Sequence, residues 1–388
     1  MTTGEAAVAV GVSTQTLRRW IRDGVVPEYD GAWTPAALGK ARLVARLRER
    51  RYTLAQIRRA TDEGRLAFGR TLELFDVGGR TYTRAQARRR TGLDAEAVDS
   101  VAAMLGIGAD QVLDEVALQV LGHVAAAIAA GLPREAMLQI ARVYTQAISQ
   151  IADAEVRLVH IYLHEPLMRS GGSPDEMASA MLSVADRLLP LTAPLLEQVH
   201  HRMLMNYIDQ DVVGHMETEL TADEDDVGRM RVAIAFADLA GYTQLTEREG
   251  DLYAVDVVDR FVGNVIATLP DDARIIKTIG DAVMVVGPDP AALADWALRL
   301  GELMSEHPRP RVAVHYGHAH YRDGDYFGGD VNLAARVQAE SGEGEVLVTR
   351  PVVEASGPAL RFEPVADVHL RGFNEPTELF RALAGVRE

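Results

Sequence analysis

The hydrophobic period of this 388-residue chain changes near Arg231, and that change limits the fold more than any other feature of the sequence. Before it, apolar residues recur at helical spacing over almost every segment. After it, VAIAFADL alternates like a β-strand, and strand-like and helix-like segments then follow one another. We therefore expect a multidomain protein with an all-α N-terminal regulatory region and a C-terminal α+β domain.

The composition indicates the cellular location and restricts the residue types that could bind a metal ion. No apolar run reaches the roughly 18 to 20 residues that span a bilayer, and the N-terminus lacks the features of a signal peptide, so we expect a cytoplasmic protein without a membrane span. The chain has no cysteine, which excludes disulfides, thiolate metal sites and a cysteine nucleophile. A bound metal would then use carboxylate, carbonyl or imidazole ligands, which favours hard ions such as Mg2+.

The net charge of −16 is unevenly distributed. Residues 1–100 hold 18 Lys and Arg against 12 Asp and Glu, which leaves 22 against 44 downstream. A basic head on an acidic body restricts contact with nucleic acid to the head.

The first 65 or so residues have the spacing of a helix-turn-helix domain. A short helix, a break at Gly11 and a second helix capped by Ser13 precede the turn-rich EYDGAWTP and two more helices. This order resembles the DNA-binding head of MerR-type regulators, and we assign residues 1–75 to such a domain.

Two interpretations of this head remain open. DNA recognition would use the basic residues of the second helix, with phosphate contacts from the RLRERR run. However, the stretch after Pro27 carries Glu28 and Asp30, where a DNA-binding wing needs basic residues. A helical packing module that no longer binds DNA is therefore the favoured interpretation.

The helix-turn-helix pattern returns about 80 residues later, with Gly92 in the place of Gly11, which indicates a duplicated unit whose second copy has lost most of its basic residues. Residues 146–220 are helical in pattern, and we expect breaks at SGGSPDE and at Pro190 and Pro194. We assign residues 76–220 to a helical regulatory domain, 221–230 to an acidic linker and 231–388 to a catalytic domain.

Two carboxylates of the C-terminal domain are positioned to converge. This domain has a βαββαβ order with further strands near VLVTR and VADVHL. Asp238 ends its first strand, and Asp281 lies just past the tip of the hairpin RIIKTIGDAVMVV, so both fall at one edge of the sheet. A two-metal phosphoryl site needs such a pair, although an Asp at a strand end is more often a cap or turn residue.

Three motifs, FADLAGYT, KTIGDA and DGDYFGGDVNLAAR, together resemble the catalytic domain of class III nucleotidyl cyclases, with its ferredoxin-like fold, over about residues 231–386. The resemblance implies an adenylyl cyclase, a phosphorus-oxygen lyase that converts ATP to 3',5'-cyclic AMP and pyrophosphate. It implies two Mg2+ or Mn2+ ions per active site, held by Asp238, Asp281 and the carbonyl of Leu239. The backbone N–H groups expected to bind the triphosphate lie at a helix start, at Gly241, Tyr242 and Thr243.

The choice of ATP over GTP rests on Lys277 and Asp325. Adenine presents an acceptor at N1 and a donor at N6, which these side chains match, and a mismatched polar pocket rejects the wrong base by a factor on the order of 10⁴. Asn332 and Arg336 share a helix face, and their matches in the family orient the ribose and bind the α-phosphate. Two further cations align more loosely with the phosphate contacts of the family: Arg311 and Arg371.

In this family the metal aspartates and the nucleotide-binding set face opposite sides of a shared cleft. Because this sequence carries both sets, we expect a head-to-tail homodimer with two equivalent active sites. The rival hypothesis is a regulator that binds DNA or a partner through its head and keeps the cyclase domain for dimerisation or nucleotide sensing. The intact metal, base and arginine positions argue against that rival.

The middle region resembles the helical autoinhibitory domain of certain actinobacterial cyclases, some of which respond to pH. Histidine titrates near neutral pH, so protonation could change how the last helix docks, although solvated or core histidines are the plainer interpretation. The candidate regulatory residues are His160, His164, His200, His201 and His215. An apolar effector among LLPLTAPLL and HHRMLMN is a further option, although such residues more often form a core or a dimer interface.

Overall fold

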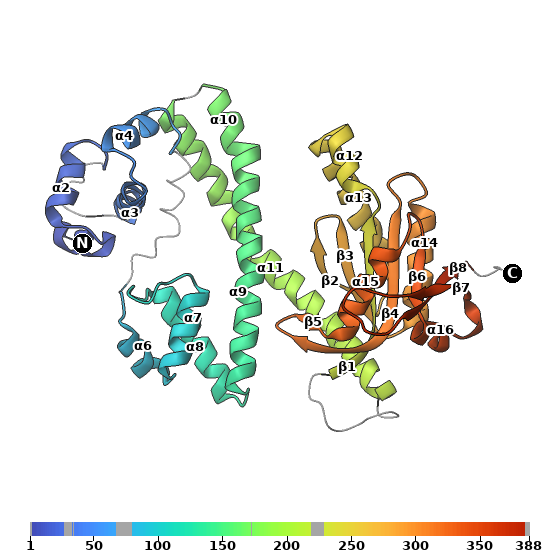
Figure 1. Cartoon of the computed structure of the whole chain (residues 1–388). Coiled ribbons are helices and arrows are strands. Elements are labelled where there is room, and N and C mark those ends of the chain that lie inside the picture. The colour runs from blue at the N-terminus through green and yellow to red at the C-terminus, as the bar shows by residue number, and fades with distance from the viewer. Residues whose placement is uncertain are drawn as a thin grey trace. The chain divides into compact units, whose positions relative to one another are not determined.

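The computed structural model describes residues 2–26, 33, 35–66, 80–171, 173–218 and 229–384. The chain divides into two compact units, Met1–Leu204 and Met205–Glu388, and the long helix α11 (Pro174–Thr218) contributes to both (Figure 1). The first unit is helical and the second is built on a β-sheet, which confirms the change of architecture predicted near Arg231.

The N-terminal helix-turn-helix is confirmed. α1 (Thr3–Val10) ends at Gly11, whose φ of 76° is the left-handed conformation that glycine adopts without strain. α2 (Thr14–Arg22) is capped by Ser13, whose Oγ accepts a hydrogen bond from the N–H of Thr16 at 3.0 Å. α3 (Pro35–Glu49) and α4 (Leu54–Asp62) complete this part of the chain. Glu28 and Asp30, which bear on the DNA hypothesis, lie outside the described residues.

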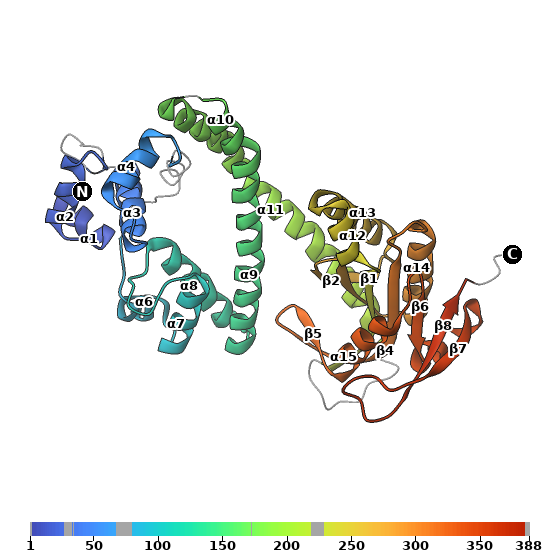
Figure 2. The ribbon, with the colours of Figure 1, turned by 45° about the horizontal axis from the view of Figure 1, so that its top comes forward.

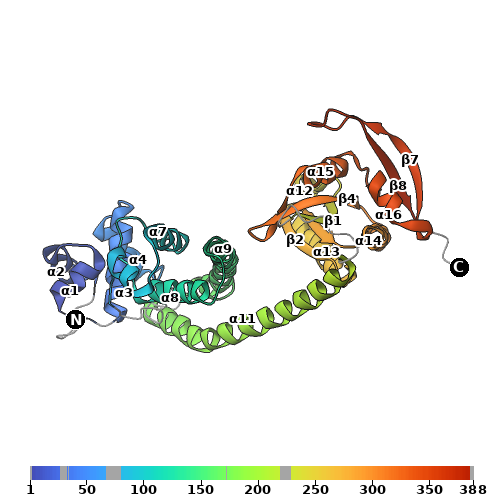
Figure 3. The ribbon, with the colours of Figure 1, turned by 90° about the horizontal axis from the view of Figure 1, so that it is seen from below.

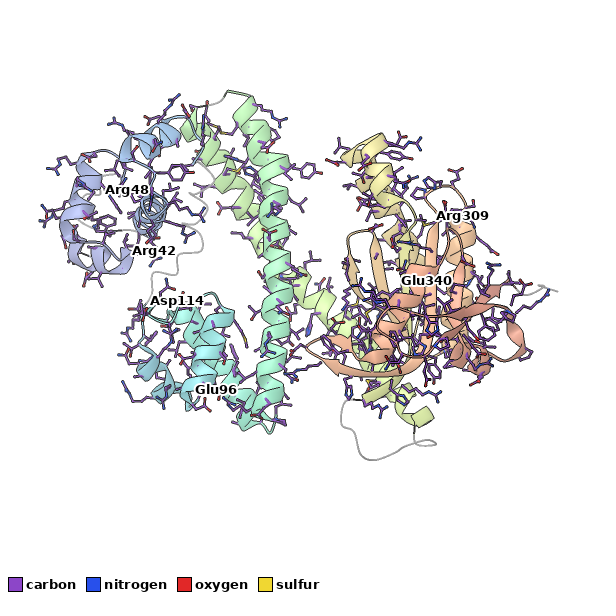
Figure 4. All side chains as sticks on the ribbon, viewed as in Figure 1. Arg42, Arg48, Glu96, Asp114, Arg309 and Glu340 are labelled. Atoms are coloured by element: carbon purple, nitrogen blue, oxygen red, sulfur yellow. The ribbon has the colours of Figure 1, made fainter. Side chains whose placement is uncertain are left out.

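The second copy of the predicted duplication has the same local structure. α6 (Arg84–Thr91) ends at Gly92, with φ 75°, and α7 (Ala95–Met104) is capped by Asp94. The first caps (Thr2 and Thr83), the glycines and the second caps each lie 81 residues apart. α8 (Glu115–Ala129) has 15 residues, as α3 does, and its cap Asp114 is labelled in Figure 4. These matching caps support the duplication.

Long helices follow. α9 (Arg134–Val159) continues through one π-helical turn, η2 (His160–His164), into α10 (Glu165–Arg169), and α11 begins at Pro174, within the predicted break SGGSPDE (Figure 2). In the part of the chain that the structure describes, no helix is long and apolar enough to cross a bilayer.

The prediction that Pro190 and Pro194 interrupt the helix is wrong, because both prolines lie inside α11. Each proline removes one backbone hydrogen bond and bends a helix rather than ending it when the flanking residues remain helical. Four residues apart, the two prolines lie on the same side of α11, so the lost hydrogen bonds are confined to one face.

The second unit contains an eight-stranded sheet with the order β2-β3-β1-β4-β6-β8-β7, in which β5 pairs only with β4. Neighbouring strands are antiparallel except β4 and β6. The strands are β1 (Arg229–Leu239), β2 (Arg274–Ile279), β3 (Ala282–Gly287), β4 (Pro310–Arg322), β5 (Asp325–Phe327), β6 (Val346–Thr349), β7 (Arg361–Val368) and β8 (Thr377–Leu383). β1 begins two residues before the predicted boundary, and RDGDYFGGD, predicted as a loop, contains β5.

Helices cover both faces of this sheet (Figure 3). α13 (Asp251–Thr268), α14 (Pro290–Leu303) and α16 (Arg350–Ala355) share one core with Ala233, Ala235 and Ala237 of β1. α15 (Gly329–Glu340) packs on the other face, in a core with Val232 and Ile234 of the same strand. Successive side chains of β1 point to opposite faces of the sheet and are apolar on both, which explains why helices lie on both sides. The remaining helices are α12 (Tyr242–Glu249) and the 3-10 turn η3 (Gly357–Ala359).

Candidate active site

Asp238 and Asp281 converge, as the sequence predicts. β1 pairs with β3 so that Asp238 lies opposite Ala282, the residue directly after Asp281. The Asp238 side chain is only 15% exposed, and its Oδ1 is buried without a hydrogen-bond partner among the described residues. A buried carboxylate oxygen without a donor is costly unless a cation or proton neutralises it.

The pKa of Asp281 reflects this closeness. Burial, together with the interaction with the Asp238 carboxylate, raises the pKa of Asp281 from 3.8 to about 6. Two carboxylates at this edge of the sheet therefore create a concentration of negative charge, which suits cation binding.

Two other side chains contact the Asp238 carboxylate. Arg311, opposite Asp238 on β4, donates from Nη2 to Asp238 Oδ2 at 2.6 Å. Gln338 of α15 donates from Nε2 to the same oxygen at 3.2 Å. The family resemblance predicts Arg311 among the phosphate contacts, and the structure places it at the carboxylates. The motifs do not identify Gln338, although the apolar pattern of Val331 and Ala334 places it near the buried side of its helix.

Lys277 and Asp325 form a close pair. Lys277 Nζ lies 2.5 Å from Asp325 Oδ2, and both side chains are partly buried, 36% and 25% exposed. The backbone N–H of Tyr326 donates to Asp325 Oδ1 at 2.8 Å, which fixes the orientation of the carboxylate. The structure thus brings together the donor and the acceptor that were predicted to read adenine, from β2 and β5.

Asn332 and Arg336 share an exposed face of α15. At about 100° per residue this face is opposite the buried face of Val331, Ala334 and Val337, which packs on the sheet. In the described part of the chain, neither side chain has a hydrogen bond or an ion pair. α15 therefore directs both residues away from the sheet that carries Asp238.

The other predicted residues lie at the ends of elements. Leu239 is the last residue of β1, with a buried side chain, and Gly241 adopts φ 74° as the cap before Tyr242 and Thr243 begin α12. β4 begins next to Arg309, which is labelled in Figure 4. The carbonyl of Arg309 accepts a hydrogen bond from the N–H of Ala240 at 3.1 Å. Arg371 is exposed in the connection between β7 and β8, and no hydrogen bond or ion pair of the described residues joins it to the other site residues.

The candidate regulatory histidines do not form one cluster. His160 and His164 lie in the π-helical turn with ring centroids 5.0 Å apart. Burial, and then the charge of His160, lowers the pKa of His164, which is 6% exposed. His200 packs edge-to-face on Tyr144, with centroids 6.3 Å apart. His201 is exposed, and the side chain of His215 lies outside the described residues.

Comparison with known proteins accounts for this arrangement. Residues 1–64 match the MerR HTH family of regulatory proteins, and residues 228–381 match the adenylate and guanylate cyclase catalytic domain. A pH-sensitive adenylate cyclase of Mycobacterium tuberculosis is 30% identical over 363 residues, which cover 89% of this chain and 88% of that protein. An adenylate cyclase of Streptomyces griseus is 31% identical over 288 residues, 71% of this chain and 69% of that protein.

Among solved structures, an adenylyl cyclase of P. aeruginosa is similar over 41% of this chain and 96% of that chain, with 19% identity and a TM-score of 0.37. The chain therefore belongs to the class III adenylate cyclases, and it carries a MerR-type helix-turn-helix domain ahead of its catalytic domain.

Proposed function

We propose that this adenylate cyclase converts ATP to 3',5'-cyclic AMP and pyrophosphate by two-metal catalysis, in active sites shared by the two chains of a homodimer. The convergence of Asp238 and Asp281, with a buried carboxylate oxygen that accepts no hydrogen bond from the described residues, carries the proposal. The Lys277–Asp325 pair supports adenine as the base.

The residues present fit a divalent metal site. Asp238, Asp281 and the carbonyl of Leu239 are hard oxygen donors, which Mg2+ and Mn2+ prefer. Among the described residues there is no cluster of three His, Asp or Glu side chains for a metal, and a site of two carboxylates and a carbonyl does not need one. When bound, two such ions would lower the pKa of the ribose 3'-hydroxyl and offset charge on the triphosphate.

The side chains of the protein bind and orient the nucleotide. Lys277 donates to adenine N1, and Asp325 accepts from the N6 amino group. Asn332 orients the ribose so that its 3'-oxygen is in line with the α-phosphorus. Arg336 stabilises the negative charge that gathers on the α-phosphate as pyrophosphate leaves. The triphosphate is held by the α12 N-terminus at Gly241, Tyr242 and Thr243, and by Arg311 and Arg371.

The direction of α15 supports the dimer. The exposed face of Asn332 and Arg336 is turned away from the sheet that carries Asp238 and Asp281. A second copy, placed head to tail, supplies this face to the carboxylates of the first, and the symmetry of the pair makes two equivalent sites.

We propose that the N-terminal helices regulate the catalytic domain. The similar M. tuberculosis protein is named as pH-sensitive, and His164 is a buried histidine with a lowered pKa in this chain, which supports protons as an effector. An apolar ligand is the alternative effector. DNA is the less favoured partner of the head, and a cytoplasmic location fits an enzyme that uses ATP.

The direct test incubates the purified full chain with Mn-ATP and with Mn-GTP and measures cyclic nucleotide. We expect cyclic AMP from ATP and far less product from GTP. Asp281→Ala should abolish product, whereas Asp272→Ala, a change at an exposed aspartate of the same unit, should not. If neither Mn-ATP nor Mg-ATP gave cyclic AMP at any pH from 5 to 8, the result would contradict the proposal.

A further inference from the structure

Arg274, at the start of β2, lies between two tyrosine rings. Its guanidinium carbon is 5.6 Å from the ring centroid of Tyr207 on α11 and 5.7 Å from that of Tyr326 on β5. Arg274 Nη2 also donates to the hydroxyl of Tyr326. A guanidinium within about 6 Å of an aromatic ring is attracted by the ring face, so this one cation links α11 to β5.

Tyr326 is the residue next to Asp325. Its side chain is 1% exposed, in the core that also holds Val331 and Ala334 of α15, and its N–H fixes Asp325 Oδ1. Arg274 and Lys277 both belong to β2, where a β-bulge separates them. β2 therefore contacts β5 through two neighbouring side-chain pairs, Arg274 with Tyr326 and Lys277 with Asp325.

α11 also contacts the turn that precedes β2. Gln210 Nε2 donates to the carbonyl oxygen of Asp271 at 2.6 Å. Tyr207 and Gln210 are three residues apart, on one face of α11, and Asp271 and Arg274 are three residues apart in the chain. The Tyr207–Arg274 and Gln210–Asp271 contacts both lie within the second unit. The segment of α11 in this unit therefore packs against β2, the strand that carries Lys277.

We propose that Arg274 is a positioning residue for the base-recognition pair, and that Tyr207 of α11 holds Arg274 in place. The regulatory helix then acts on adenine recognition, at the Lys277–Asp325 end of the site. If α11 moves away from β2, Arg274 loses its contact with the Tyr207 ring and becomes exposed to water. Its interaction with Tyr326 then weakens, and the Asp325 carboxylate is less well oriented. This inference rests on the proposed function of Lys277 and Asp325.

The test uses full-length variants. Arg274→Gln removes the cation, Arg274→Lys keeps it without the planar donor fork, and Tyr207→Leu removes the ring. The matched controls are Arg299→Gln on α14, where Arg299 pairs with Asp295 at 2.9 Å, and Tyr253→Leu on α13, 45% exposed against 42% for Tyr207. For each protein we measure the KM and kcat for ATP and the inhibition constant of GTP, and calorimetry checks folding.

We expect the ratio of the GTP inhibition constant to the KM for ATP to fall about tenfold in Arg274→Gln and about threefold in Tyr207→Leu, with KM changing more than kcat. Arg274→Lys should lie between the wild type and Arg274→Gln. The double variant should match Arg274→Gln alone, because Tyr207 acts through Arg274.

Failure of the inference is separable from failure of the proposed function. A wild type that shows no preference for ATP refutes the role of Lys277 and Asp325 before any variant is compared. A selective wild type whose Arg274 and Tyr207 variants keep the ratio of the controls overturns the inference, as does an additive double variant. If Arg274→Gln does not fold, Arg274→Lys and Tyr207→Leu still decide the result.

Discussion

Replacing Asp281 by asparagine should make the catalytic unit more stable while it abolishes activity. Asparagine has nearly the shape of aspartate and carries no charge. In the absence of a divalent ion, the folded wild type holds two carboxylates close together, and Asp238 Oδ1 is buried with no donor in the part of the chain that the structure describes. The substitution removes the cost of burying the Asp281 charge and its repulsion by Asp238, and it also removes a proposed metal ligand.

The magnitude follows from the pKa of Asp281, which folding raises from 3.8 to about 6. A shift of about 2 pKa units corresponds to about 3 kcal/mol, and solvent screening of this partly buried side chain reduces the effect to about 1 to 2 kcal/mol. Because the folded pKa is the higher one, the stabilisation from the protonated carboxyl is complete below pH 3.8 and is lost as the pH rises through 6. The variant does not titrate, so its advantage grows with pH.

Calorimetry in a chelating buffer at pH 7.5 tests this directly. For a unit of this size, 1 kcal/mol moves the melting temperature by about 2 to 4 °C, so one transition of Asp281→Asn should rise by about 2 to 8 °C. The gain should shrink towards pH 4, and Asp272→Asn, at an exposed position, should show none of it. A variant no more stable than the wild type at pH 7.5 would refute the idea that burial and the neighbouring Asp238 carboxylate make charged Asp281 costly in the folded state.

Two further predictions concern stability. Burial lowers the pKa of His164, so the stabilisation from its neutral ring is complete above pH 6.5 and is lost as the pH falls below that value. The melting temperature of the wild type should therefore drop more between pH 7.5 and pH 5.5 than that of His164→Phe. An equal loss would contradict this. Gly317→Ala should cost about 1 to 3 kcal/mol of unfolding free energy. Its Cβ would lie 2.2 Å from Asp330 Oδ2 and 2.5 Å from His315 Nε2, and an unchanged denaturation midpoint would show that these groups can move.

Most of the architecture follows from the sequence because it depends on local patterns. Ser13 and Asp94 are good helix caps, Gly11 and Gly92 can take φ above zero, and the continuous apolar run VAIAFA of β1 matches a strand buried on both faces. Each of these signals lies within a few residues, so the structure reproduces it.

The differences arise where the outcome depends on distant residues. β5 has three residues, and a strand that short forms only because β4 pairs with it. α11 continues through Pro190 because helical residues lie on both sides, although the local rule predicts a break. Neither result can be read from a short window of sequence.

The residues of the candidate site also fall into two groups, those that sequence motifs predict and those that depend on tertiary packing. The positions of Asp238, Asp281, Lys277 and Asp325 follow from motifs, and the structure brings each pair together. The contact of Gln338 with Asp238 joins residues 100 apart and depends on how α15 lies on the sheet, which no motif encodes.

The central claim is that each active site combines the aspartates of one chain with the α15 face of its partner. It is tested by mixing two inactive full-length variants, Asp281→Asn and Arg336→Ala, after denaturation and joint refolding. Random pairing gives half of the dimers one intact site out of two, so the mixture should recover about a quarter of the wild-type rate of cyclic AMP formation. A mixture as inactive as its two components would contradict the shared site.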